Sequence, residues 1–308
     1  MSKNQPAMQS FDTLIGIVQA FPDEQSAVDH FTAMRWADGA YCPLCGSTRV
    51  YHFSDKRTHK CGDCRKRFSI KVGTIFENSK IELRKWMLAV WLITSHKKGI
   101  ASTTLAKDLG VTQKTAWFML HRLRHAARTQ SFNRPLEGDI EVDETYVGGK
   151  AANRHKGDPK NGPGTSGKTA VIGALERGGK VHAKVIDNTD TKSLDTFVHT
   201  MVAPASNVST DEHSGYRHLG RTYAHGVVRH GAGEYVKGAT HTNGIEGYWS
   251  QLKRQIIGIH HFVTPKHLNR YVSESAWRFN LRSMGEGERV NEMLASTTGR
   301  LTYKDLIA

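Results

Sequence analysis

The cysteines constrain this chain's fold more than any other feature. All four lie in one short window, as Cys42-Pro-Leu-Cys45 and, after fifteen intervening residues, Cys61-Gly-Asp-Cys64. Paired C-x2-C spacing is typical of a structural zinc site, in which four thiolates hold Zn²⁺ tetrahedrally. We therefore predict a zinc ribbon over residues 41–76, with these four ligands: Cys42, Cys45, Cys61 and Cys64.

Two disulfides are the alternative use of the same cysteines. The N-terminus, Met1 to Pro6, has no apolar segment typical of an export signal, and the longest apolar stretch, Trp86 to Ile93, is too short to span a bilayer. Disulfides are rare in proteins that are not exported, and C-x2-C disulfides are usually redox-active rather than structural. Zinc is therefore the favoured interpretation, and no membrane partner is expected.

Charge and length indicate a basic protein with several domains. The 308 residues include 43 Lys and Arg against 29 Asp and Glu, which gives a formal net charge of +14. Such a charge favours a polyanionic partner, although moderately basic proteins with other functions are common. The length favours more than one domain. Residues 1–40 are predicted to form a helical cap on the ribbon, with one amphipathic helix from Asp23 to Trp36.

Residues 77–131 have the pattern of a helix-turn-helix region. A strongly apolar helix is predicted at 81–96, a second at 101–109, and a third from Thr112 to about residue 128, with the break at Gly110-Val111. The third helix is the candidate for reading the major groove. Its candidate DNA-contacting residues are Lys114, His121, Arg122 and Arg124. The alternative is an ordinary helical hairpin with a solvated basic face.

The second half of the chain predicts a sheet with helices, over residues 136–283. The order is a strand to Val147, a hairpin at 169–186, a helix at 191–201, a strand to Asp211 and a helix from Asn243. Three antiparallel strands, a helix and a fourth strand beside the first describe an RNase H-like layer. The fold class is therefore a multidomain α+β or α/β protein, with residues 284–308 as a C-terminal tail.

Three acids in this half suggest a metal site. Asp143 ends the β-patterned run 139–143 of the first predicted strand, and Asp211 ends the fourth. These two strands are neighbours in such a fold, and the last helix can bring Glu246 to the two aspartates. Hard divalent cations prefer oxygen ligands, and two of them can stabilise the attacking and leaving oxygens of a phosphodiester displacement. We therefore predict that Asp143, Asp211 and Glu246 are catalytic and bind Mg²⁺ or Mn²⁺.

The third acid has alternatives within its own helix. Asn243-x-x-Glu246 fits a capping box, and the Asn243 amide oxygen is itself an acceptable Mg²⁺ ligand. Charge favours Glu246. Lys253 lies seven residues further on, close to two turns, so it projects from the same helix face about 10 Å along the axis. Lys253 and the adjacent Arg254 are candidate DNA contacts, although a solvated charge is the alternative.

Residues 153–168 predict a mobile loop that ends in a misleading motif. Gly162 to Thr169 fits the phosphate-loop pattern G-x-x-x-x-G-K-[ST]. That pattern needs a strand before it and a helix after it. No apolar run precedes it here, and a β-hairpin is predicted to follow, so we expect no nucleotide cofactor.

Three motifs resemble a known family. They are Asp143-Glu-Thr-Tyr-Val-Gly-Gly-Lys150, His241-Thr-Asn-Gly-Ile-Glu246-Gly-Tyr-Trp-Ser-Gln-Leu-Lys253-Arg254 and Pro265-Lys-His-Leu-Asn-Arg-Tyr271. Together with the ribbon they resemble the bacterial zinc-ribbon DDE transposases of ISXO-type insertion sequences, which are related to the eukaryotic Merlin transposons. The 34 residues between the second and third acids are similar to the spacing in such enzymes.

The resemblance implies a DNA transposase that binds terminal inverted repeats, hydrolyses a phosphodiester at the element end and transfers the freed 3′-hydroxyl to target DNA. Its partners would be double-stranded DNA, as element ends and target, and further copies of the chain in a homo-oligomer. It would be a cytoplasmic bacterial protein, nucleoid-associated when bound to DNA. Two alternatives remain: an RNase H-like nuclease or resolvase without strand transfer, and a zinc-ribbon DNA-binding regulator whose acids are structural.

Overall fold

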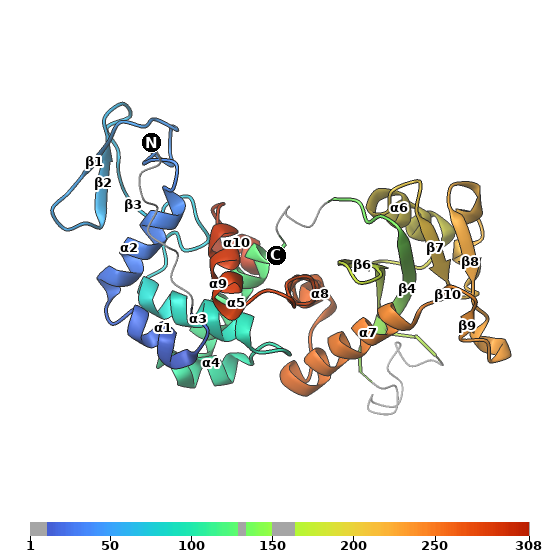
Figure 1. The fold of residues 1–308 in the computed structure, drawn as a ribbon. Coiled ribbons are helices and arrows are strands. Elements are labelled where there is room, and N and C mark those ends of the chain that lie inside the picture. The colour runs from blue at the N-terminus through green and yellow to red at the C-terminus, as the bar shows by residue number, and fades with distance from the viewer. Residues whose placement is uncertain (1–10, 129–133, 150–163, 308) are drawn as a thin grey trace. The chain divides into compact units, whose positions relative to one another are not determined.

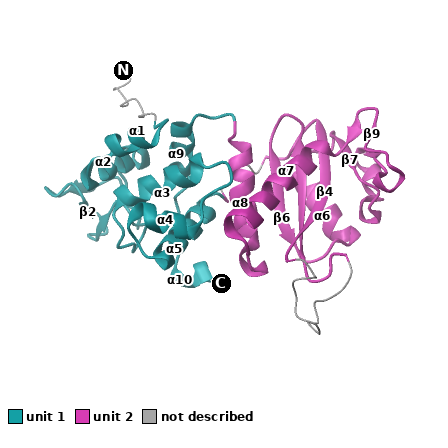
Figure 2. Cartoon of the chain, turned by 90° about the horizontal axis from the view of Figure 1, so that it is seen from below, with its two compact units in different colours: residues 1–127, 283–308 teal, residues 128–282 magenta. Residues whose placement is uncertain are grey.

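The computed structural model describes residues 11–128, 134–149 and 164–307. The chain divides into two compact units, residues 1–127 with 283–308, and residues 128–282 (Figure 2). No helix among the described residues is both long enough and apolar enough to cross a membrane.

The first unit begins with two helices, α1 (Leu14–Ala20) and α2 (Glu24–Arg35). The Asp23 carboxylate caps α2 by accepting from the Ser26 amide at 2.8 Å. Glu24 then uses both carboxylate oxygens to accept the amides of Leu83 and Arg84, each at 2.9 Å, at the start of α3 (Leu83–Ser95). The predicted helices are therefore confirmed, and α2 packs on α3 as well as leading into the ribbon.

The predicted ribbon follows as a small antiparallel sheet. Its strands are β1 (Val50–His52), β2 (Thr58–Cys61) and β3 (Arg67–Ser69), in that order. Cys42 and Cys45 come from the turn before β1, whereas Cys61 ends β2 and Cys64 lies in the turn that follows. Phe68 is buried against the cysteines, and Trp36 packs against the same cluster.

Two further helices follow α3, as the sequence predicts. α4 (Ser102–Leu109) ends at Gly110, whose φ of +61° lies in the left-handed region that glycine adopts readily. Thr112 then caps α5 (Gln113–Ala126) by accepting from the Thr115 amide at 3.2 Å. The two helices and the turn between them are confirmed.

The C-terminal residues belong to this first unit rather than forming a tail. They fold as α9 (Glu286–Ala295) and α10 (Tyr303–Ile307). Val290, Met293 and Leu294 are buried where α9 packs on α3. Their i, i+3, i+4 spacing is that of an amphipathic helix, so residues 286–295 pack within the first unit, contrary to the expectation of a tail at 284–308.

The second unit is built on a five-stranded mixed sheet with the order β6-β5-β4-β7-β8 (Figure 1). In this sheet, β5 pairs antiparallel with both β4 and β6. β7 pairs parallel with β4, and β8 pairs parallel with β7. The predicted hairpin and the predicted fourth strand beside the first are therefore confirmed. The strands are β4 (Asp139–Val147), β5 (Thr169–Glu176), β6 (Val181–Ile186), β7 (Asn207–Thr210) and β8 (Ala224–Val227).

Helices cover both faces of this sheet. α6 (Thr191–Met201) buries Leu194 and Phe197 on one face. α7 (Asn243–Gln255) and α8 (Pro265–Asn280) cover the other. Gly173 allows α7 to approach closely, because a Cβ there would lie 2.6 Å from the Trp249 ring. The remaining elements are the 3₁₀ turns Ser214–Tyr216, Leu219–Arg221 and His230–Ala232, the strands β9 (Val236–Lys237) and β10 (Thr240–His241), and a π-helical turn, Ile256–His260.

Candidate functional site

The four cysteines meet at one point in the ribbon. Their Sγ atoms all lie within 4.8 Å of one another. Cys42 Sγ lies 3.8 Å from Cys64 Sγ, and Cys45 Sγ lies 3.6 Å from Cys61 Sγ. A tetrahedral Zn²⁺ with Zn–S bonds of about 2.3 Å separates its sulfurs by about 3.8 Å, so the spacing fits zinc and is far too long for disulfides.

The backbone of the second knuckle favours a thiolate at Cys61. Burial raises the pKa of this thiol, but the amides of Cys64 and Asp63 each donate to its sulfur at 3.4 Å and lower the pKa to about 6. Zinc binds thiolates, so this turn prepares the ligand for the metal. The four-cysteine cluster thus fits a zinc ribbon.

Removing zinc is expected to unfold the ribbon alone. Cys61→Ser or a strong chelator should abolish ordered structure around residues 41–69, because so short a segment has little apolar core of its own. Hydrogen exchange mass spectrometry should show rapid exchange there, with the sheet of the second unit still protected. Purified protein that lacks zinc, or that shows four reactive thiols in its native state, would contradict the assignment.

A second cluster of possible metal ligands lies on the sheet of the second unit. Carboxylate oxygens of Asp143, Glu144 and Asp211 lie within 4.8 Å of one another. Asp211 directly follows β7, as predicted, but Asp143 lies in the middle of β4, which continues to Val147. The register pairs Glu141 with Ser209, so two residues further on Asp143 lies level with Asp211. The predicted meeting of the two aspartates is therefore confirmed.

The acids reach this point from both faces of β4. Asp143 lies on the α7 face, where its Oδ2 accepts from Trp249 Nε1 at 3.0 Å. Glu144 lies on the α6 face, where it accepts from the Tyr216 hydroxyl at 2.7 Å. Because β7 stops at Thr210 while β4 continues, side chains from both faces can converge beyond the end of β7. Strand alternation points Glu144 away from Asp143, which is why sequence reasoning missed it.

Crowding changes the titration of these acids. Burial, together with the charges of Glu144 and Asp211, raises the pKa of Asp143 to about 7, although the Trp249 hydrogen bond opposes this. Burial and the Asp211 charge also raise the pKa of Glu144, against the hydrogen bond from Tyr216. Three carboxylates so close cannot all ionise without a counter-charge, so the cluster fits a divalent cation with oxygen ligands.

Glu246 lies outside this cluster. Its Oε1 accepts from the Thr242 hydroxyl at 2.9 Å and lies 3.6 Å from His230 Nε2, and its side chain is 46% exposed. The helix cap is Thr242 rather than Asn243, which is the exposed first residue of α7. The alternative of a capping box between Asn243 and Glu246 is therefore not what the structure has, and Glu246 is not part of the cluster of Asp143, Glu144 and Asp211.

His230 nevertheless connects Glu246 to the segment that follows Asp211. Glu212, the next residue, accepts from the His230 amide at 2.7 Å and from the Gly231 amide at 2.8 Å. The imidazole of the same His230 approaches Glu246. Glu246 is therefore on the side of α7 that faces the Asp211 segment, separated from it by His230.

Glu141 is a further residue that sequence reasoning missed. This buried carboxylate accepts from the amides of Gly244 and Ile245 at 2.7 and 3.0 Å, which caps the start of α7, and from Arg177 Nε at 2.8 Å. It lies two residues before Asp143 on the same face of β4, and that spacing on a strand is the only signal the sequence offers. Glu141 thereby fixes the helix of Glu246 to the strand of Asp143.

Glu141→Ala is expected to destabilise the protein by roughly 3–5 kcal/mol, because it leaves two helix amides without their acceptor and the Arg177 guanidinium without its carboxylate partner. Glu141→Gln keeps an oxygen for the amides and should cost less. Thermal unfolding measures both, with Glu137→Ala at a neighbouring exposed position as the control. If Glu141→Ala melts like Glu137→Ala, the carboxylate does not anchor α7.

The predicted DNA-contacting face of α5 is largely buried. His121 and Arg124 are only 0% and 1% exposed. The His121 ring lies tilted against Trp117 with ring centroids 3.9 Å apart, and a guanidinium nitrogen of Arg122 donates to the Ile75 carbonyl. His121 and Arg124 are therefore buried and Arg122 is half-buried, so the predicted contact of these three residues with DNA stays a prediction that their burial disfavours.

The other predicted basic residues remain accessible. Lys114, in the first turn of α5, is exposed. Lys253 and Arg254 are exposed on α7, where Arg254 Nε donates to the Ser250 carbonyl at 3.0 Å.

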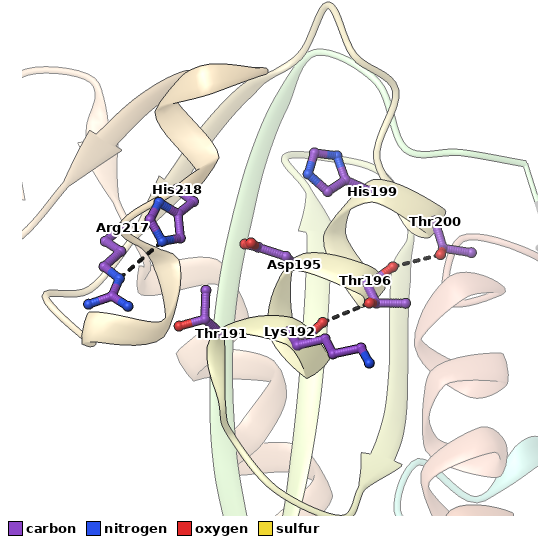
Figure 3. A pocket seen from close by; sticks show the side chains of 8 residues that line it. All are labelled: Thr191, Lys192, Asp195, Thr196, His199, Thr200, Arg217 and His218. Atoms are coloured by element: carbon purple, nitrogen blue, oxygen red, sulfur yellow. Dashed lines mark hydrogen bonds between the residues drawn. The ribbon is translucent and has the colours of Figure 1, made fainter.

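A separate hollow of about 700 Å³ lies against α6 (Figure 3). Arg217 Nε donates to His218 Nε2 at 3.1 Å on one side of it, opposite α6. None of the predicted acids lines it, so it is not the metal site. Its lining residues are Thr191, Lys192, Asp195, Thr196, His199, Thr200, Arg217 and His218.

The phosphate-loop pattern does not continue into a helix. The strand β5 begins at Thr169, directly after Lys168. Residues 150–163, including Gly162 and most of the predicted mobile loop, lie outside the described residues.

Comparisons with known proteins find matches in both parts of the chain. Residues 22–67 match a transposase zinc-ribbon domain, and residues 135–280 match an ISXO2-like transposase domain. A Halobacterium salinarum protein, described as an uncharacterized protein in transposable element ISH50, is 29% identical over 271 residues, which cover 83% of this chain and 90% of that protein.

The two matching domains together account for more than half of the chain, in the order that the family motifs predict. The first contains the four-cysteine cluster, and the second contains the Asp143–Asp211 cluster. The chain belongs to the ISXO2-like, zinc-ribbon transposases of insertion sequences.

Proposed function

We propose that this chain cuts DNA at the ends of an insertion sequence and joins the freed ends to target DNA, using an RNase H-like catalytic domain. The observation that carries the proposal is the pairing of Asp143 with Asp211, from neighbouring parallel strands of a mixed sheet, inside an ISXO2-like transposase domain. The strand order and the helices on both faces are those expected of an RNase H-like layer.

Asp143 and Asp211 would hold Mg²⁺ or Mn²⁺. A bound divalent cation would supply Lewis-acid stabilisation of the phosphodiester oxygens and lower the pKa of an attacking water. Trp249 holds the Asp143 carboxylate in place through its Nε1 hydrogen bond. Deprotonated Asp143 is the ligand form, so metal binding should release a proton below about pH 7.

The chemistry needs two in-line displacements. In the first, the oxygen of water attacks the phosphorus, the bond to the 3′-oxygen breaks, and that oxygen leaves as a 3′-hydroxyl. In the second, this hydroxyl attacks a phosphorus in target DNA and loses its proton, while the displaced 3′-oxygen takes up a proton through solvent and leaves as a new 3′-hydroxyl. No covalent bond to the protein forms at either step.

Glu246 is the proposed third ligand, in preference to Glu144. Its carboxylate is half-exposed and held by one hydroxyl and one imidazole, so a rotation of its side chain can release it toward Asp211. Glu144 is instead held by the Tyr216 hydroxyl and lies 3.8 Å from His213 Nε2. Glu144 would therefore make the electrostatic potential of the site more negative, from the opposite face of β4.

The first unit would recognise the terminal repeats through the zinc ribbon and the first turn of α5. Two element ends must be brought together, which favours a homo-oligomer bound to double-stranded DNA.

Lys114→Ala should weaken DNA binding by about three- to tenfold. The plot of log binding constant against log salt concentration should become less steep by about one unit, the contribution of about one phosphate contact. His121→Ala should have no such effect on the salt dependence, because His121 is buried. Fluorescence anisotropy at several salt concentrations measures both. An unchanged slope for Lys114→Ala would remove this turn from the interface.

The direct test uses a duplex that carries the inverted repeats flanking the coding region. We expect a nick at the repeat boundary with Mg²⁺ and none with EDTA. A DNA-binding regulator would bind this duplex without cutting it under any metal condition.

A further inference from the structure

The corner between α7 and α8 exposes apolar side chains in an unusual setting. Ile257 and Phe262 are 66% and 67% exposed, and the two lie close together in the sequence among basic residues. They lie five residues apart, one in the π-helical turn that ends α7 and the other just before α8. Between them, His261 has a φ of +60°, which is uncommon for a residue with a side chain.

Basic residues surround this corner. Lys253 and Arg254 are exposed on the last turns of α7, and His261 and Lys266 are exposed beside Phe262. No acidic residue occurs in the segment from Gly247 to Ser273. The positive charge of this surface therefore favours a polyanion as its binding partner, rather than a protein with balanced charge or a second copy of this basic chain.

The corner also continues a stripe on α7. Lys253 lies seven residues after Glu246, within about 20° of two whole helical turns, and Ile257 lies in the π-helical turn that directly follows α7. This stripe of side chains runs from Glu246 through Lys253 to Ile257, about 16 Å along the axis. At about 3.4 Å per stacked nucleotide, that length corresponds to about five nucleotides of one DNA strand.

We propose that Ile257 and Phe262 form a base-stacking platform for unpaired DNA that leaves the metal site along α7, with Lys253 and Arg254 holding the backbone of the same strand. Apolar and aromatic side chains stack on any base, and basic neighbours bind the phosphates, which together recognise separated strands without reading sequence. This inference rests on the proposed function in assigning the metal site to DNA cleavage.

The test compares two DNAs of the same sequence without metal ion, so that cleavage cannot contribute. One is a fully paired duplex, and the other is a forked duplex with five unpaired nucleotides on each strand. Fluorescence anisotropy at about 0.1 M salt should show that the wild-type chain binds the fork about tenfold more tightly. The double variant Ile257→Ala/Phe262→Ala should bind both DNAs equally.

The matched control is Ile15→Ala in α1, because Ile15 is 69% exposed but lies in the first unit. It should keep the fork preference. Absence of the preference in the wild-type chain, or its survival in the double variant, would overturn the proposal. So would a change in the elution volume of the double variant without DNA, which would identify the corner as a contact between copies.

Cleavage of the paired repeat duplex with Mg²⁺ is measured in parallel. A chain that prefers forks but never cuts would retain the stacking platform and refute the proposed function. A chain that cuts the paired duplex but binds the forked and paired DNAs equally would support the proposed function and refute the stacking platform.

Discussion

Asp143→Asn should reduce Mg²⁺-dependent cleavage by about a thousandfold or more, because it removes a ligand charge worth several kcal/mol in the transition state. The substitution keeps the side-chain volume and an oxygen that can accept from Trp249. DNA binding should therefore stay near wild type. Gel-based cleavage assays with Mg²⁺, alongside anisotropy, separate the two effects.

The same substitution should stabilise the metal-free protein. The pKa of Asp143 is raised from its usual value of 3.8 to about 7, so the folded state binds a proton that the unfolded chain releases between these values. The wild-type protein therefore loses stability as pH rises from about 4 to about 7, and Asn removes that loss. At pH 8 the variant should melt several degrees higher, and Mg²⁺ should raise the melting temperature only of the wild type.

Asp187→Asn is the control for this experiment, since Asp187 is exposed in the same unit and the change in charge is identical. It should leave cleavage and the effect of Mg²⁺ unchanged. Cleavage that survives in Asp143→Asn or in Asp211→Asn would remove that residue from the catalytic site.

Glu246→Gln should abolish cleavage while thermal stability barely moves. Its amide oxygen can still accept from the Thr242 hydroxyl, so the local structure is kept and only the negative charge is lost. Mn²⁺ should restore part of the activity, because it accepts weaker ligands more readily than Mg²⁺.

The comparison with Glu144→Gln decides between the two candidate ligands. Glu144→Gln keeps an acceptor for Tyr216 and relieves repulsion with Asp143, so it should lower cleavage less than Glu246→Gln does. Asn243→Ala should remain active. If Glu144→Gln is inactive and Glu246→Gln is active, the cluster seen in the structure already contains the complete ligand set.

The parts of the fold that follow from local chemistry could be predicted from the sequence. The cysteine spacing predicts the meeting of Cys42, Cys45, Cys61 and Cys64, because two turns of fixed length bring the thiolates together. Helix patterning similarly predicts the turn at Gly110. The strand order follows from a hairpin, a helical crossover and a parallel return, which leave few arrangements.

The errors concern features that depend on tertiary packing. His121 and Arg124 are polar, so helix periodicity places them on an exposed face of α5. They are buried because α5 is covered on several sides. Glu144 points to the other face of β4, and only the early end of β7 allows it to approach Asp211. Side-chain pairing with Thr242 and His230 likewise keeps Glu246 from the aspartates, which no spacing in the sequence indicates.

A strand-transfer assay tests the central claim most directly. The substrate is an element end already cut to expose its 3′-hydroxyl, mixed with a supercoiled target plasmid and Mg²⁺. The account predicts covalently joined products with the wild-type chain, and none with Asp211→Asn or with an end that carries a 3′-deoxy terminus. Cutting of the uncut end without any joining would identify a nuclease or resolvase and contradict the account.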